Sequence, residues 1–185
     1  CIETDLSLDF SLDLASLSRL DTLNIATDTG GIAGYSSGAI ASSTNYAAVG
    51  YQHIGYNVGG VVGRSSGQVL ACSNEGAICG RKDVGGIAGI VSDDSFVINC
   101  YSTVEKITAN SSYASVVGYS KKGNLQNIYG NSACPSKSAA NSAVGSDKAA
   151  GTVWKKTTFA LLSLDEMKSG AVTAVSYTHL RAHET

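Results

Sequence analysis

The stretch that decides the fold is GGIAGYSSG at residues 30–38, because the chain repeats it with small changes further on. The later copies read GGVVGRSSG at residues 59–67 and GGIAGIVSDD at residues 85–94. Clustered glycines occur in phosphate-binding loops and also in structural repeats, so a single copy would not separate these two interpretations. Three copies favour the structural repeat.

The last glycine of each copy gives a reference point for measuring the period. These reference glycines are Gly34, Gly63 and Gly89, and Gly118 takes the same place in a degenerate fourth copy, ASVVG. They are separated by 29, 26 and 29 residues. A period of this length is typical of a solenoid, in which each repeat forms one coil that cannot bury its apolar face alone.

Matching positions in the four copies carry matching residues, which supports the repeat. An apolar column precedes the reference glycines, a turn column follows them, and two further columns of apolar or small residues come next. Asp replaces glycine in the turn column of the third copy, and Asp tolerates the positive φ angle that many turns require. In chain order, the columns are Ile32, Val61, Ile87 and Val116; Gly38, Gly67, Asp93 or Asp94, and Gly123; Ile40, Val69, Val97 and Leu125; and Ser43, Cys72, Cys100 and Ile128.

The segments between the turns favour β-strands over helices. Their apolar runs are short, rich in Val and Ile, and bounded by Gly, Ser, Asn and Asp, with no period of 3.6 residues. We therefore predict an all-β fold, a parallel β-solenoid (β-helix) of about four to five coils. Coils stacked about 4.8 Å apart would place like residues above like and give a rod of roughly 20 Å.

Two of the copies resemble the GLUG motif. They are NVGGVVGRSSGQV at residues 57–69 and DVGGIAGIVSDDSFVINCYS at residues 83–102, and the resemblance covers about residues 30–130. The GLUG family occurs in bacterial surface and secreted proteins, including adhesin-like proteins and the non-catalytic part of some immunoglobulin-A metalloproteases. The resemblance implies a right-handed β-solenoid at the cell surface or outside the cell. The fourth copy has Ala114 and Ser115 where the paired glycines belong, so we expect the solenoid to loosen there.

The segments outside the repeats suggest a division of the chain into four parts. Apolar residues alternate strictly with Ser and Asp in LSLDFSLDL, residues 6–14, which predicts a strand that caps or begins the rod. Asp9 and Asp13 project from one side of this strand, so a calcium site is the less favoured alternative. Near the other end, Ser163 and Glu166 predict the capping box of a short helix. The expected parts are residues 1–29, a capping strand or incomplete coil; 30–133, the repeats; 134–174, a C-terminal loop, a strand with Trp154 and the short helix; and 175–185, a tail.

The tail, VSYTHLRAHET, differs abruptly from the rest of the chain. It resembles the translation of a sequencing adapter, so we interpret it as non-native sequence. His179 and His183 have helical zinc-site spacing but lack the glutamate of the H-E-x-x-H motif, and we assign them no chemistry. We also expect a leader, a surface anchor or further domains to lie outside these 185 residues.

Composition and motifs argue against several classes of ligand. The chain has a formal net charge of −2, which gives no reason to expect a nucleic acid as partner. The nearest approach to a phosphate-binding loop, GAICGRK at residues 76–82, has one residue too few between its glycines. The five cysteines have no C-x-x-C spacing, so we expect no metal and no cofactor.

The candidate nucleophiles also have structural explanations. His53 is the one histidine outside the tail that qualifies as a general base, and a cysteine could pair with it. However, Cys72 and Cys100 share a repeat column, which predicts that both pack in the interior as small apolar residues. As neighbours in the stack they could also approach disulfide distance, so their oxidation state stays open.

The main enzymatic alternative is a carbohydrate-active β-helix. Such an enzyme needs convergent carboxylates, and the repeats contain Glu75, Asp83, Asp93, Asp94 and Glu105. Asp93 and Asp94 are adjacent and fall in a predicted turn, which favours a solvated corner. Exposed tyrosines could stack on sugar rings or dock a protein, but a stacked ladder beside the coils is the favoured interpretation of Tyr35, Tyr119, Tyr46, Tyr51 and Tyr56. We therefore expect no catalytic residues and a non-catalytic structural or adhesive module that binds a surface glycan or a protein. A non-catalytic region of a larger secreted metalloprotease is the third hypothesis.

The first apolar column gives a direct test of the solenoid. The double substitution Val61→Asp and Ile87→Asp would bury two charges in the stacked interior. Each buried charge costs several kcal/mol, so the two together cost about as much as the whole free energy of unfolding of a typical domain. We expect far-UV circular dichroism to show an unfolded chain. Cooperative thermal unfolding of this double variant would show that the column does not face inward.

Overall fold

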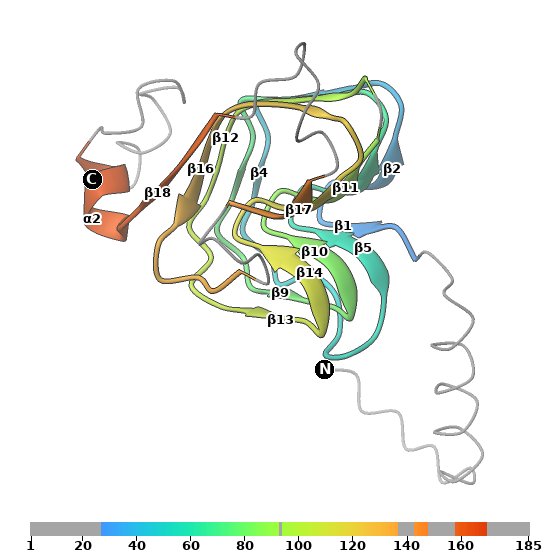
Figure 1. Cartoon of the computed structure of the whole chain (residues 1–185), viewed down its shortest axis with the longest axis horizontal. Helices are drawn as coiled ribbons and strands as arrows, with labels where there is room; N and C mark the ends of the chain where they lie inside the picture. Colours follow the sequence, from blue (N-terminus) through green and yellow to red (C-terminus); the bar gives the residue numbers. More distant parts are fainter. Residues whose placement is uncertain (1–26, 93, 137–142, 148–157, 170–185) are drawn as a thin grey trace, which may run out of the picture.

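The computed structural model describes residues 27–92, 94–136, 143–147 and 158–169. Over these residues the chain winds through about four turns of a parallel β-solenoid, which confirms the predicted fold class. Figure 1 shows the turns overlying one another. The expected strand at 6–14, its two aspartates, Trp154 and the tail at 175–185 lie outside the described residues.

Three parallel sheets run along the solenoid, and each turn adds one strand to each sheet. In stacking order, the first sheet contains β1 (Thr29–Gly30), β5 (Tyr56–Gly59), β10 (Lys82–Gly85) and β14 (Ser111–Ala114). The second contains β2 (Ala33–Ser36), β6 (Val62–Ser65), β11 (Ala88–Val91), β15 (Val117–Ser120) and β17 (Val144–Asp147). The third contains β3 (Ala39–Ala41), β7 (Gln68–Leu70), β12 (Phe96–Ser102), β16 (Asn124–Asn131) and β18 (Phe159–Leu162).

Shorter strands complete the turns. β4 (Thr44–Asn45) and β8 (Ser73–Asn74) continue the third sheet, and β9 (Ile78–Cys79) pairs with β13 (Ile107–Thr108) on the remaining side. We call β1–β4 coil 1, β5–β9 coil 2, β10–β13 coil 3 and β14–β16 coil 4. β17 and β18 begin a fifth.

The predicted apolar columns form the core. The backbone N–H of Val61 donates to Ile87 O, and that of Ile87 donates to Val116 O, so these side chains stack in register, and all three are fully buried. Ile40, Val69, Val97 and Leu125 also pair in order along the third sheet. Ile32 occupies the first position of its column but is 48% exposed, because no described coil stacks beyond it.

The predicted turn column is wrong in the third copy. Phe96 pairs with both Gln68 and Asn124, so the residue stacked between Gly67 and Gly123 is Ser95 rather than Asp93 or Asp94. The ladder hydrogen bonds fix this register, and they leave three residues between Val91 and Ser95 where the second copy has one between Ser65 and Gly67. Asp93 lies outside the described residues. Asp94 does have the positive φ expected of a turn, at 61°.

The reference glycines lie where two sheets approach most closely. A Cβ on Gly89 would collide with the backbone of Asn57 and Val58 in the first sheet, and Gly118 faces Asp83 in the same way. The facing column itself has left-handed backbone, with φ of 44–59°. Asn and Asp tolerate this conformation better than most residues, and they fill three of its four positions. The column consists of Asp28, Asn57, Asp83 and Ser112.

The second glycine of each pair makes room for a side chain from the opposite wall of its own coil. A Cβ on Gly60 would collide with the side chain of Asn74, and one on Gly86 with that of Ser102. In coil 4 the two walls exchange roles: Ser115 supplies the side chain, and a Cβ on Gly130 would collide with it. This exchange explains why coil 4 does not loosen as expected. β14 and β15 keep their pairing, and Val116 is fully buried.

The stack continues beyond residue 133. Val144 pairs with Val117, and a Cβ on Gly145 would meet the backbone of Gly118 and Tyr113, as at the earlier reference glycines. Gly145 is therefore a fifth reference glycine, 27 residues after Gly118.

The short helix ends the described part of the chain and lies beside β18 (Figure 1). α2 (Leu164–Lys168) has the predicted capping box. The N–H of Glu166 donates to Ser163 Oγ at 3.2 Å, and the N–H of Ser163 donates to Glu166 Oε2 at 2.8 Å. Met167 is fully buried in a small cluster with Tyr101.

The exchange in coil 4 predicts strong coupling between Ser115 and Gly130. Gly130→Ser alone overpacks the interior, and we expect it to lower the free energy of unfolding by about 1–3 kcal/mol. Ser115→Gly removes the main obstacle to Gly130→Ser. Of the three atoms nearest to a Cβ on Gly130, two belong to Ser115, and the third is Leu161 Cδ2 at 3.1 Å. Urea unfolding of the four variants measures the coupling energy. Additive effects would contradict the packing described here.

Candidate functional site

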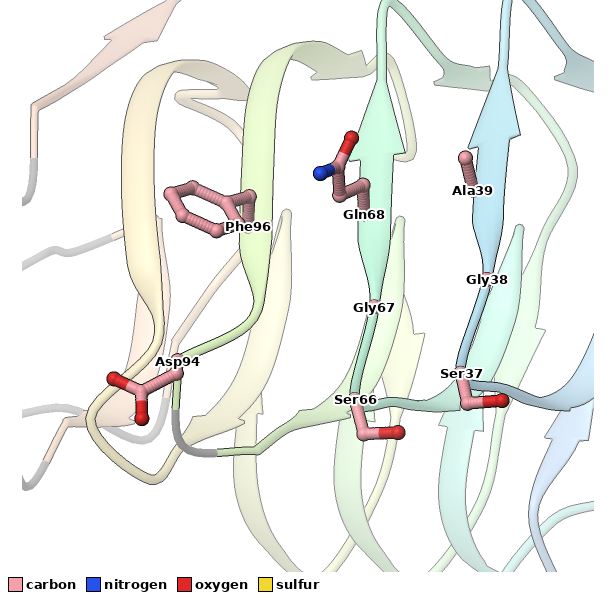
Figure 2. Close-up of a pocket in the computed structure, with 8 residues that line it drawn as sticks. All are labelled: Ser37, Gly38, Ala39, Ser66, Gly67, Gln68, Asp94 and Phe96. Atoms are coloured by element: carbon pink, nitrogen blue, oxygen red, sulfur yellow. The ribbon is translucent and has the colours of Figure 1, made fainter.

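An open groove lies on the outside of the solenoid, at the corner between the second and third sheets. Its volume is about 350 Å³. The groove crosses coils 1, 2 and 3, so equivalent positions of three repeats build it side by side (Figure 2). The lining residues are Ser37, Gly38 and Ala39 from coil 1, Ser66, Gly67 and Gln68 from coil 2, and Asp94 and Phe96 from coil 3.

The register of the third sheet places one part of this lining. Ala39 pairs with Gln68, which pairs with Phe96, so three outward side chains stand on neighbouring strands. Gln68 is exposed and Phe96 is half-buried, so a ligand can reach the amide and one side of the ring.

The corner supplies the polar part of the lining. Ser37 and Ser66 come from the repeated SSG phrase, and their hydroxyls point the same way in Figure 2. Ser66 Oγ lies 2.8 Å from Tyr35 Oη, which ties the corner to the outer face of the second sheet. The extra residues of coil 3 place Asp94, which is exposed, at the far end of the groove.

The groove combines an aromatic ring with an amide, two hydroxyls and a carboxylate. Aromatic rings pack against the apolar faces of sugars and side chains, while the polar groups provide hydrogen bonds around the ring. Asp94 is the one carboxylate lining the groove among the described residues.

A second groove, of about 410 Å³, brings together two of the acids considered from the sequence. Glu75 and Glu105 both line it, and Lys106 and Leu164 stand beside them. Both carboxylates are exposed. Among the described residues they are the two acids that line this groove, and Asp83 and Asp94 lie elsewhere.

Asp83 lies within the stack and not in a groove. It is 8% exposed, and its Oδ1 atom has no hydrogen-bond partner among the described residues. Burial raises the pKa of this carboxyl group, while Lys82 and a hydrogen bond with Ser112 act in the opposite direction. In the same column, Asn57 Nδ2 donates to Asp28 Oδ1 at 2.7 Å. Arg64 forms an ion pair with Asp28 at 2.9 Å, which the repeat pattern alone did not indicate.

Among the described residues, the hydrogen-bond partner of the His53 ring is Asn110 and not a cysteine. His53 is exposed, and its Nδ1 atom lies 2.8 Å from Asn110 Oδ1. Cys72 and Cys100 are fully buried in the main core cluster, as their shared column predicted. Both are free thiols. Tyr35 and Tyr119 share a column on the second sheet, but Arg64 and Ile90 lie between them, so they do not form a continuous ladder.

Neither a metal-binding cluster nor a membrane-spanning helix is present among the described residues. They contain no group of three or more His, Cys, Asp or Glu side chains placed to hold a metal ion. No helix in this part of the chain is long and apolar enough to cross a membrane. Comparisons of the chain with models of known protein families, with curated proteins and with solved structures found no match.

The raised pKa of Asp83 predicts a pH-dependent effect of Asp83→Asn. A folded-state pKa above the unfolded value of about 3.9 favours folding at low pH, and this contribution disappears as the pH rises through the folded pKa. Replacing the carboxylate with the residue found at Asn57 should therefore stabilise the fold at neutral pH, by about 1 kcal/mol, and have little effect near pH 3. Urea unfolding at the two pH values measures this, with the exposed Glu105→Gln as control. An equal effect at both pH values would show that ionisation is not the cause.

Proposed function

We propose that this chain is a non-catalytic structural or adhesive module of a secreted or cell-wall-attached bacterial protein, and that it binds a surface glycan. The groove with Phe96 at its side is the observation that carries the glycan-binding proposal. Stacked coils form a rod, and a rod holds its outer faces at fixed spacing, which suits repeated contacts with an extended polymer.

The chemistry of the groove favours a sugar over a peptide strand. A peptide bound by strand addition would need an open sheet edge, whereas the groove lies on the outer face of strands that are already paired in the sheet. Phe96 offers a flat apolar surface, and Gln68 and the two serines surround it with hydrogen-bonding groups. Such a site is shallow and open, so weak binding repeated along a polymer is its natural mode.

The cellular location rests on a different observation. The glycine phrases at residues 57–69 and 83–102 resemble the GLUG motif of bacterial secreted and surface proteins. The proposed extracellular or cell-surface location comes from this resemblance, as does the expectation that the module is joined to other domains of the same protein.

Binding to immobilised bacterial and host-surface polysaccharides tests the proposal. We expect Phe96→Ala to weaken binding to the polysaccharide that retains the wild-type chain by about tenfold, since loss of one aromatic stacking contact costs about 1 kcal/mol or more. Tyr51→Ala is the matched control, because Tyr51 is 78% exposed and lies outside the groove. Thermal unfolding of both variants verifies that they remain folded.

Three results would overturn this assignment. Equal binding by the Phe96 and Tyr51 variants would remove the groove from the site. Absence of binding across the polysaccharide panel would reject the glycan as ligand. Release of reducing sugars or unsaturated products would instead favour the carbohydrate-active enzyme.

A further inference from the structure

Cys72 and Cys100 occupy the same position on neighbouring coils. Ladder pairs flank them on both sides, since Leu70 pairs with Ile98 and Ser73 pairs with Tyr101. Paired strands lie about 4.8 Å apart, which falls within the range of about 4.4–6.8 Å that Cα atoms of disulfide-bonded cysteines adopt. The backbone separation therefore suits a disulfide between coils 2 and 3.

The thiol groups are already close to this arrangement. The backbone N–H of Cys72 donates to Cys100 Sγ at 3.5 Å, so the sulfur of Cys100 is directed toward the coil that carries Cys72. The Cys72 thiol donates to Leu70 O at 3.3 Å and to Ile40 O at 3.6 Å, on the side of coil 1. Rotation of the Cys72 side chain about its Cα–Cβ bond is the main movement needed to bring the two sulfurs together.

The remaining described cysteines lie on other positions of the stack. Cys79 pairs with Thr108, and Cys134 is buried in the second core cluster with Ile107. Within the described residues, Cys72 and Cys100 are thus the pair that the sheet register aligns. Each of the two cysteines directly follows a bend in its coil. The preceding residues, Ala71 and Asn99, have left-handed backbone with φ of 50° and 56°.

We propose that Cys72 and Cys100 form a redox-responsive site, in which a disulfide joins coil 2 to coil 3. The oxidant is a low-molecular-weight disulfide. One cysteine thiolate attacks it, forms a mixed disulfide and releases one small thiol. The second cysteine, after losing its proton, attacks the mixed disulfide and releases the second small thiol. The protein loses two thiol hydrogens, and the small disulfide is reduced to two thiols.

The surroundings of the two thiols determine how an oxidant can reach them. Burial is the main cause that raises the pKa of Cys100, whereas the hydrogen bond with Cys100 lowers the pKa of Cys72. Cys72 also lies nearer to coil 1, the end of the described stack. Because both side chains are fully buried, the reagent reaches them when the coils separate locally or before they have stacked. Local opening of the stack therefore comes before the attack, and either cysteine can be the first to react.

The disulfide would close the chain between residues 72 and 100 into a covalent loop and bind two coils that otherwise hold together by ladder hydrogen bonds and packing. A loop of this length restricts the unfolded chain, and the expected result is a rise in Tm of about 5–10 °C. The site acts independently of glycan binding at the groove, so the two proposals can fail separately.

The experiment refolds the whole chain from urea in a buffer of oxidised and reduced glutathione, blocks the remaining thiols by alkylation, and digests the product with trypsin. Cleavage after Arg64, Arg81 and Lys82 places Cys100 in a different peptide from Cys72 and Cys79, so fragmentation of the linked peptides, repeated with Cys79→Ser, identifies a Cys72–Cys100 link by mass spectrometry. We expect this link to be the main product, and we expect reduction to reverse the rise in Tm. Cys79→Ser should retain both effects, and Cys72→Ser should lose both.

The proposal fails if alkylation finds Cys72 and Cys100 both free after refolding in the oxidising buffer. It also fails if the main link joins Cys79, Cys134 or glutathione to one of them. A Cys72–Cys100 link that lowers Tm would show that the disulfide strains the stack, and would reject its role as a clamp between coils.

Discussion

The in-register stacking of parallel coils is the constraint on which the rest of this structure depends. Each strand hydrogen-bonds to the equivalent strand of the next coil, so every residue lies against its counterpart about one repeat away. This register selects β-branched residues at Val61 and Ile87 and decides which outer side chains stand together at the groove. It also aligns Cys72 with Cys100. The core, the proposed glycan site and the proposed redox site are therefore products of one periodic arrangement.

A narrow interior is the second condition, and it accounts for the glycines. The reference glycines face the backbone of the first sheet, where the left-handed column of Asp28, Asn57, Asp83 and Ser112 lies. The second glycine of each pair faces a side chain across the coil. A Cβ on Gly86 would also meet the backbone carbonyl of Ser115 in the next coil, whereas across the coil itself Ser115 with Gly130 gives the same combination of one side chain and one glycine as Ser102 with Gly86.

The sequence alone predicted the features that recur with the period. The apolar columns, the parallel stacking, the interior position of Cys72 and Cys100, and the capping box at Ser163 all follow from spacing and local residue preference. Features that depend on a partner distant in the chain were missed. The role of Ser115 requires knowledge of Gly130 on the opposite wall, and the true place of Ser95 requires knowledge of ladder hydrogen bonds.

The groove could not be predicted from the sequence, for a similar reason. Its lining combines residues of three copies and includes Asp94, which the spacing alone offered for a regular column. Gly145 was detectable, since AVGSD lies 27 residues after Gly118, but the surrounding small polar residues obscured the fifth copy. Ile32 matches its column and is still 48% exposed, because a repeat pattern does not specify the ends of a stack.

The exchange between Ser115 and Gly130 has a consequence for how such a gene can change its number of repeats. The glycine and the side chain that faces it always belong to the same coil. A gene crossover in the segment of β9 or β13 therefore keeps every such pair together. A crossover between the two walls produces hybrids of coils 3 and 4. One hybrid carries Ser115 opposite Ser102 and is overfilled, and the other carries Gly86 opposite Gly130 and has a void. Selection against both products would confine the breakpoints of duplications and deletions to one side of the rod.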